Sequence, residues 1–162
     1  MQGMQPQIKL PIETEDKFSE WLGKAEITHK ERLGAGSIIY LRSILEQITI
    51  DVGKKAGVDI YPKGKTDGRT KPFAQVLKAV DEKCAIIPVI YSDNGYKLFQ
   101  KLSEIAHGNA DEETALREYE PLRRLVVGIM DNVKKIEEEL KSNAEIKKAL
   151  NAIGFSNGGE EE

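Results

Sequence analysis

The chain has 162 residues, of which 40% are hydrophobic and 31% are charged, and its formal net charge is −3. This is the composition of a globular domain that can bury a core, and it excludes a disordered or fibrous chain. The one cysteine, Cys84, excludes an intramolecular disulfide and a multi-thiolate metal site. No apolar stretch is long enough to span a bilayer and residues 1–12 lack a signal-peptide pattern, so we expect a cytoplasmic protein. Because the net charge is negative, any contact with nucleic acid must come from a local basic patch.

The first half of the chain predicts two helices after an extended lead-in, residues 1–12. From Glu13 the apolar residues recur at steps of three and four, which predicts an amphipathic helix. A second helix follows, and Gly53 and Gly57 mark its expected end. The inward positions are Phe18, Trp21, Leu22 and Ala25 in the first helix and Ile38, Leu41, Leu45, Ile48 and Val52 in the second.

Residues 57–71 are predicted to form a loop because they are rich in glycine and basic residues. Pro72 suits the first position of a third helix, which extends to Cys84. The segment AIIPVIY, residues 85–91, is predicted to be a buried turn or the end of that helix, since Pro88 argues against a strand.

The second half of the chain also predicts helices. Residues 92–95 should open a fourth helix that Gly108 ends, and Asn109 or Asp111 should cap a short helix. Pro121 should kink or restart the chain. The inward positions are Leu98, Phe99, Leu102, Ile105 and Ala106 before it, and Leu122, Val126, Ile129, Val133, Ile136 and Leu140 after it. The four-three spacing of residues 122–140 is typical of a helix packed in a bundle.

A final amphipathic turn or two carries Ile146, Leu150 and Ile153, and residues 154–162 are expected to form a disordered acidic tail. The fold prediction is one all-α domain, residues 13–153, built as a compact bundle of about five or six helices.

Two segments together resemble a known superfamily. GSIIYLRSILEQI places Arg42 and Glu46 four residues apart on an apolar helix, and YKLFQKLSEIAHGNADEETALREYEPLRRLV is a helix that ends in His107 before a long amphipathic helix. This order resembles the HEPN superfamily, the higher-eukaryote and prokaryote nucleotide-binding helical bundles, over roughly residues 13–140. The nearest likeness is an uncharacterised bacterial branch found alone or attached to defence-related proteins.

The resemblance implies a helical bundle that commonly dimerises. Active members are metal-independent endoribonucleases with an arginine four to six residues before a histidine; the histidine can move a proton and the guanidinium can bind phosphate. Here Lys101 stands six residues before His107, and lysine lacks the planar guanidinium fork. Some members carry a tyrosine two residues after the histidine, where this chain has Asn109. The departures imply a non-catalytic or impaired module.

A polar cluster between the second and fourth helices is the candidate functional site. Its predicted members are Arg42, Glu46, Ser103, His107 and Asn109. In a catalytic role, His107 would act as general acid or base while Lys101 or Arg42 neutralises the phosphate. In a structural role, the cluster would tie the two helices together. His107 followed by Gly108 also fits an ordinary helix C-terminus.

A basic loop is the second candidate site, because phosphates of RNA or another polyanion would bind there. Its residues are Lys63, Lys65, Arg69 and Lys71. The spacing excludes a P-loop, and a solvated loop is the alternative. His29 is expected at the surface and Cys84 in the core.

Three functions remain open. The first is a HEPN-like module, non-catalytic or impaired, that binds a protein partner or an RNA or nucleotide ligand in bacterial defence or toxin–antitoxin biology. The second is an active endoribonuclease that uses His107, and the third is a structural protein that assembles through residues 122–140. We expect a homodimer and no metal or cofactor.

Overall fold

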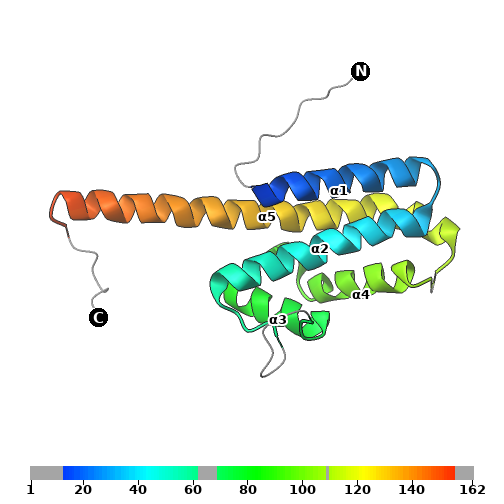
Figure 1. Cartoon of the computed structure of the whole chain (residues 1–162), viewed down its shortest axis with the longest axis horizontal. Helices are drawn as coiled ribbons and strands as arrows, with labels where there is room; N and C mark the ends of the chain where they lie inside the picture. Colours follow the sequence, from blue (N-terminus) through cyan, green and yellow to red (C-terminus); the bar gives the residue numbers. More distant parts are fainter. Residues whose placement is uncertain (1–12, 62–68, 109, 156–162) are drawn as a thin grey trace, which may run out of the picture.

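The computed structural model describes residues 13–61, 69–108 and 110–155, and these form an all-α bundle of five helices without a strand (Figure 1). The elements in chain order are α1 (Glu13–Lys30), α2 (Gly34–Ala56), α3 (Phe73–Cys84), the short 3-10 helix η1 (Val89–Tyr91), α4 (Asn94–Ala106) and α5 (Glu112–Ala152). The predicted fold class and the lower of the two predicted helix counts are confirmed for the described residues.

Helix α2 is the centre of the bundle, because it packs against each of the other four helices. Its predicted inward residues Ile38, Leu41 and Leu45 are fully buried. Its two buried hydroxyls are satisfied within the helix: Ser37 donates to the carbonyl of Gly34, and Thr49 donates to that of Leu45. A helix covered on several sides can keep polar side chains in the core only when they find such partners.

Glycines close both α2 and α4. Gly57, with a φ of 76°, follows the last residue of α2, and Gly108, with a φ of 82°, follows the last turn of α4. Both adopt the left-handed conformation that closes a helix and that side chains disfavour. Gly53, also expected at the end of α2, lies inside the helix instead. A Cβ there would stand 2.9 Å from Val80 Cγ2, so this glycine lets α3 approach α2 closely.

Helix α5 is one continuous helix of 41 residues, so the predicted restart of the chain at Pro121 is wrong. The short helix, the four-three stripe and the final amphipathic turns all belong to α5. Pro121 is exposed, whereas Tyr119, two residues before it, and Leu122, directly after it, are buried. The lost backbone hydrogen bond therefore faces water, while the packing on both sides of the proline keeps the helix axis continuous.

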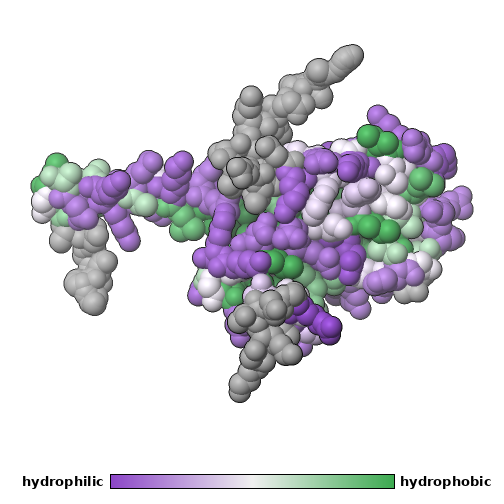
Figure 2. All heavy atoms as spheres, viewed as in Figure 1, coloured by the Kyte–Doolittle hydropathy of each residue, from purple (hydrophilic) through white to green (hydrophobic). Residues whose placement is uncertain are grey.

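Only the first part of the four-three stripe is buried in the bundle. Leu122, Val126, Ile129 and Val133 are at most 6% exposed, whereas Leu140 is 64% exposed. Beyond that point α5 projects from the bundle, and Figure 2 shows apolar surface among the hydrophilic side chains of the projecting part. The stripe is thus divided between a core role and a surface role.

The segment after α3 is only partly buried, which corrects the prediction of a buried turn. Ile86 and Ile87 are in the core, but Val89 and Ile90 are 92% and 87% exposed. The hydroxyl of Tyr91 donates to the carbonyl of Leu125 at 2.6 Å and fixes η1 against α5. With Tyr91 held in this way, the side chains of Val89 and Ile90 point into the solvent.

Within the described ranges, no helix has the combination of length and apolar character needed to cross a lipid bilayer.

Candidate functional site

The structure brings together three of the predicted cluster residues where α2 packs on α4. Arg42 Nε donates to Ser103 Oγ at 3.0 Å, and an Arg42 terminal nitrogen lies 3.1 Å from Glu46 Oε2. The side chains of Arg42 and Glu46 are 26% and 30% exposed, so the group is half-buried. The guanidinium therefore has both a neutral and an anionic partner and ties the two helices together.

Phe99 completes this cluster, and the sequence prediction had assigned it only a packing role. The guanidinium carbon of Arg42 lies 5.3 Å from the centre of the Phe99 ring, which is a cation–π contact. Phe99 precedes Ser103 by one helical turn, so both side chains project from the same face of α4. The four-residue spacing of Phe99 and Ser103 could have indicated from the sequence that Phe99 belongs to the cluster.

His107 lies next to the cluster in the chain but outside its hydrogen bonds. It is the C-cap residue that directly follows α4, its backbone N–H donates to the carbonyl of Ser103, and its side chain is exposed. Among the described residues, no hydrogen bond or ion pair joins its imidazole to Arg42 or Glu46. Asn109 lies outside the described residues. The observed geometry is that of a helix-terminal histidine.

Lys101 forms an ion pair between α4 and α5. Its Nζ lies 3.1 Å from Glu118 Oε1. The two cations considered for phosphate neutralisation, Arg42 and Lys101, thus each face a carboxylate of this protein. A phosphate would have to compete with that carboxylate in either place.

The predicted basic loop is described only in part. Lys63 and Lys65 lie outside the described residues. Arg69 is exposed, and Lys71 Nζ lies 3.5 Å from Asp59 Oδ2. The backbone N–H of Lys71 also donates to the carbonyl of Ile60, which holds the end of the loop beside its beginning. The described part therefore shows one solvated cation and one paired cation.

A second polar cluster, between α1 and α5, was missed by the sequence prediction. His29 is half-buried rather than at the surface: its ring stacks on that of Tyr119, and its Nε2 lies 3.3 Å from the carbonyl oxygen of Leu116. Glu26 and Arg123 form an ion pair beside it. Burial and the negative charge of Glu26 raise the pKa of the Tyr119 hydroxyl. His29 follows the fully buried Ala25 by four residues, which placed it on the inner side of α1.

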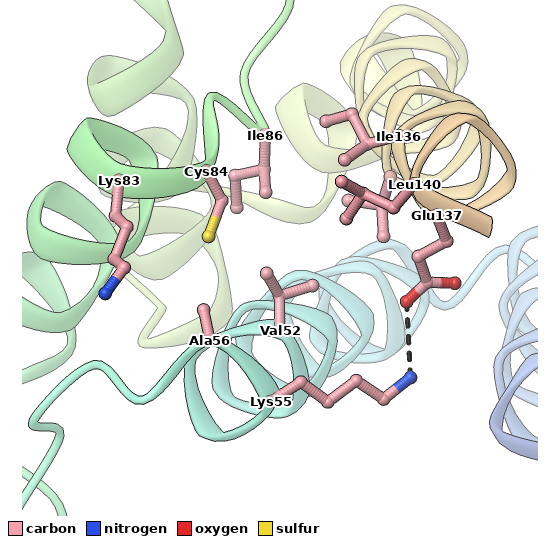
Figure 3. A pocket seen from close by; sticks show the side chains of 10 residues that line it. Val52, Lys55, Ala56, Lys83, Cys84, Ile86, Ile136, Glu137 and Leu140 are labelled. Atoms are coloured by element: carbon pink, nitrogen blue, oxygen red, sulfur yellow. Dashed lines mark hydrogen bonds and ion pairs between the residues drawn. The ribbon is translucent and has the colours of Figure 1, made fainter. Parts of the chain in front are cut away.

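An apolar cavity of about 450 Å³ opens where the end of α2, the end of α3 and the start of the projecting part of α5 meet (Figure 3). Lys55 and Glu137 form an ion pair of 3.3 Å at its edge. Cys84, predicted to be core, is half-buried and lines this cavity. The other apolar side chains around it include Val52, Ala56, Ile86, Ile136 and Leu140.

In the part of the chain that the structure describes, no three side chains of histidine, cysteine, aspartate or glutamate are grouped so that they could hold a metal ion. Comparison with family models, with curated proteins and with solved structures gave no match to this chain.

Proposed function

We propose that this protein is a non-catalytic helical interaction module that binds a protein partner along the projecting part of α5. We define residues 137–152 as the free half of α5. The observation that carries the proposal is the exposure of large aliphatic side chains on this segment and just after it. Leu140, Ile146 and Ile153 are 64%, 53% and 67% exposed.

The free half of α5 exposes apolar side chains that a binding partner could cover. It is about 24 Å long at 1.5 Å per residue. In proteins, most of the stability of a helix comes from packing its apolar face, not from intrinsic propensity. A single exposed leucine needs no explanation, but apolar residues repeated along one projecting helix are typical of a surface that binds a partner. The adjoining apolar cavity extends this surface onto the bundle.

The contacts of Arg42, Lys101 and His107 support the proposal that the protein is non-catalytic. Arg42 is held by Glu46 and Ser103, and Lys101 is paired with Glu118. His107 forms no described contact with either cation, and a lysine stands where the HEPN resemblance implies an arginine. The membership of the HEPN superfamily, a role in bacterial defence or toxin–antitoxin biology, a cytoplasmic location and a homodimeric state are further parts of this proposal.

A direct test compares the proteins retained by the tagged wild-type chain and by Leu140→Lys/Ile146→Lys. Both positions are exposed, so we expect an unchanged melting temperature and the loss of every specifically retained protein, whether another protein or an untagged copy of this chain. The matched control Glu138→Gln/Glu145→Gln makes the same net charge change away from the aliphatic side chains and should retain what the wild type retains. Identical retention by both double variants would contradict the proposal.

The second candidate function is RNA binding or endoribonuclease activity at the cluster of α2 and α4. The half-buried Arg42 guanidinium favours it, because the guanidinium lies on Phe99 and donates to Ser103, which stands one helical turn before His107. Wild-type protein and His107→Ala should be incubated with mixed RNA in EDTA. Cleavage by the wild type and not by the variant would support the enzyme and overturn the non-catalytic proposal.

A further inference from the structure

The second half of α5 is complementary to a second, antiparallel copy of itself. When the two copies are aligned with Asn143 opposite Asn143, residues equally far from position 143 stand at the same level. In residues 133–153, each large aliphatic residue then faces another. The pairs are Val133 with Ile153, Ile136 with Leu150, and Leu140 with Ile146. The same alignment matches charges of opposite sign, of which only the pair of Glu139 with Lys147 lies on the contact face; the others are Glu138 with Lys148 and Lys141 with Glu145. A two-fold antiparallel helix pair requires this symmetry, because both subunits contribute the same surface patch.

The helical geometry places these pairs on different faces. At about 100° per residue, the six aliphatic positions fall within about 80° of Asn143, which therefore lies in the middle of one apolar face. Glu139 and Lys147 lie about 40° from Asn143, inside that face. Glu138 lies about 140° away and points to the opposite side. An asparagine in the middle of an apolar helix face is a known means of fixing the register of a helix pair.

The bundle covers this face at Val133 and leaves the remainder of it open for a second helix. Leu140, Ile146 and Ile153 are more than half exposed, whereas Val133 is covered by the bundle. In the symmetric register, the end of the second helix reaches the level of Val133 and Ile136. Both residues line the apolar cavity, so the arriving aliphatic residues find apolar surface on α5 and on the bundle beside it (Figure 3).

We infer that two copies of this chain associate through residues 133–153 as an antiparallel helix pair, with Asn143 of each copy at the two-fold axis. The overlap is about 30 Å long, which corresponds to three heptads. The inference rests on the proposed function, since it names a second copy of this chain as the partner of the free half of α5.

A charge exchange in the full-length chain tests the register. Sedimentation velocity should show a dimer for the wild type. Glu139→Lys places a lysine at the level of Lys147 of the second copy, twice by symmetry, and should weaken the dimer ~10-fold or more. Adding Lys147→Glu should restore the wild-type affinity. Glu138→Lys makes the same charge change on the outer face and should change the affinity less than ~2-fold.

Engineered cysteines test the direction of the helices in a Cys84→Ser background. Asn143→Cys should form a disulfide with its own counterpart under mild oxidation. Leu150→Cys should not, because two such residues lie about 20 Å apart along the axis, beyond the roughly 7 Å that a disulfide spans. A mixture of Ile136→Cys and Leu150→Cys chains should form the cross-linked heterodimer.

The outcomes separate this inference from the proposed function. A chain that is monomeric at all concentrations, or a disulfide formed by Leu150→Cys alone, overturns the antiparallel dimer. A monomer that still retains another protein through Leu140 and Ile146 would leave the proposed binding of a protein partner in place, and would overturn only the homodimeric part of the proposed function. Restoration of the dimer by the second charge change, together with cross-linking at position 143, supports the inference.

Discussion

The imidazole of His29 lies against the phenol ring of Tyr119, with the ring centroids 4.2 Å apart and the ring planes inclined by 16°. The contact connects the last turn of α1 to α5, and Glu26 and Arg123 form an ion pair between the same two helices. Tyr119 is completely buried, so its ring is part of the core and its hydroxyl is desolvated beside the charge of Glu26. Aromatic packing and charge together thus hold α1 to α5.

Substitutions at Tyr119 should separate the contribution of the ring from that of the hydroxyl. Tyr119→Ala should lower the free energy of unfolding by ~3–5 kcal/mol, because it leaves a large cavity and removes the stack on His29. Tyr119→Phe keeps the ring and should cost less than ~1 kcal/mol. Urea denaturation measures both values. An equal cost for the two variants would mean that the hydroxyl, not the ring, dominates at this position.

The cluster of Arg42, Glu46 and Ser103 should matter for stability, while His107 should not. Arg42→Ala removes a half-buried guanidinium with two polar partners, and we expect a loss of ~1–2 kcal/mol. His107→Ala changes an exposed side chain and should cost less than ~0.5 kcal/mol.

A double-mutant cycle with Ser103→Ala measures the coupling between Arg42 and Ser103, which should be at least ~0.5 kcal/mol. Urea denaturation at one fixed pH gives all four values of the cycle. Independent effects of the two substitutions would show that their hydrogen bond adds no stability.

Two glycines in helices should respond in opposite ways to alanine. A Cβ at Gly34 would stand 2.7 Å from Ala115 Cβ and 2.9 Å from the backbone oxygen of Glu112. Gly34→Ala should therefore separate α2 from the start of α5 and cost ~1–3 kcal/mol, despite the higher helix propensity of alanine. Gly23 has open space around it in α1, so Gly23→Ala should stabilise by ~0.5–1 kcal/mol. Thermal unfolding of the two variants checks the signs, and stabilisation by Gly34→Ala would contradict the close approach.

The start of α5 should give stability a dependence on acidic pH. Asp111 Oδ1 accepts a hydrogen bond from the backbone N–H of Thr114 at 2.8 Å. The hydrogen bonds from Thr114 lower the pKa of Asp111 below its ordinary value of about 4. The stability that this adds is complete above the pKa of the unfolded chain and is lost as the pH falls through the lower pKa of the folded state.

Asp111→Asn keeps an oxygen acceptor at the helix N-terminus but does not titrate. Wild-type protein should have the higher melting temperature near pH 7, and the difference should shrink below about pH 4. Melting curves of both proteins from pH 7 to pH 2.5 measure it. A difference that grows on acidification would contradict the assignment of the cap.

The helices of this protein could be predicted because their signals are local. Apolar residues at steps of three and four mark one face of a helix, and glycines such as Gly57 and Gly108 mark where the backbone must leave it. The expectation that Pro121 interrupts the helix was also based on local sequence. It failed because the buried residues Tyr119 and Leu122 hold the helix in place before and after the proline. Packing energy from distant helices exceeded the cost of one missing hydrogen bond.

The sequence by itself determined the all-α architecture, the spacing of Arg42 and Glu46, and the self-complementary pattern centred on Asn143. Only the tertiary structure decided that Arg42 reaches Ser103, that His29 stacks on Tyr119, and that the apolar stripe of α5 leaves the core after Val133. The physical reason is the range of the interactions. Helix periodicity involves residues three or four apart, whereas the partner of a side chain and the end of a core depend on how helices far apart in the sequence pack together.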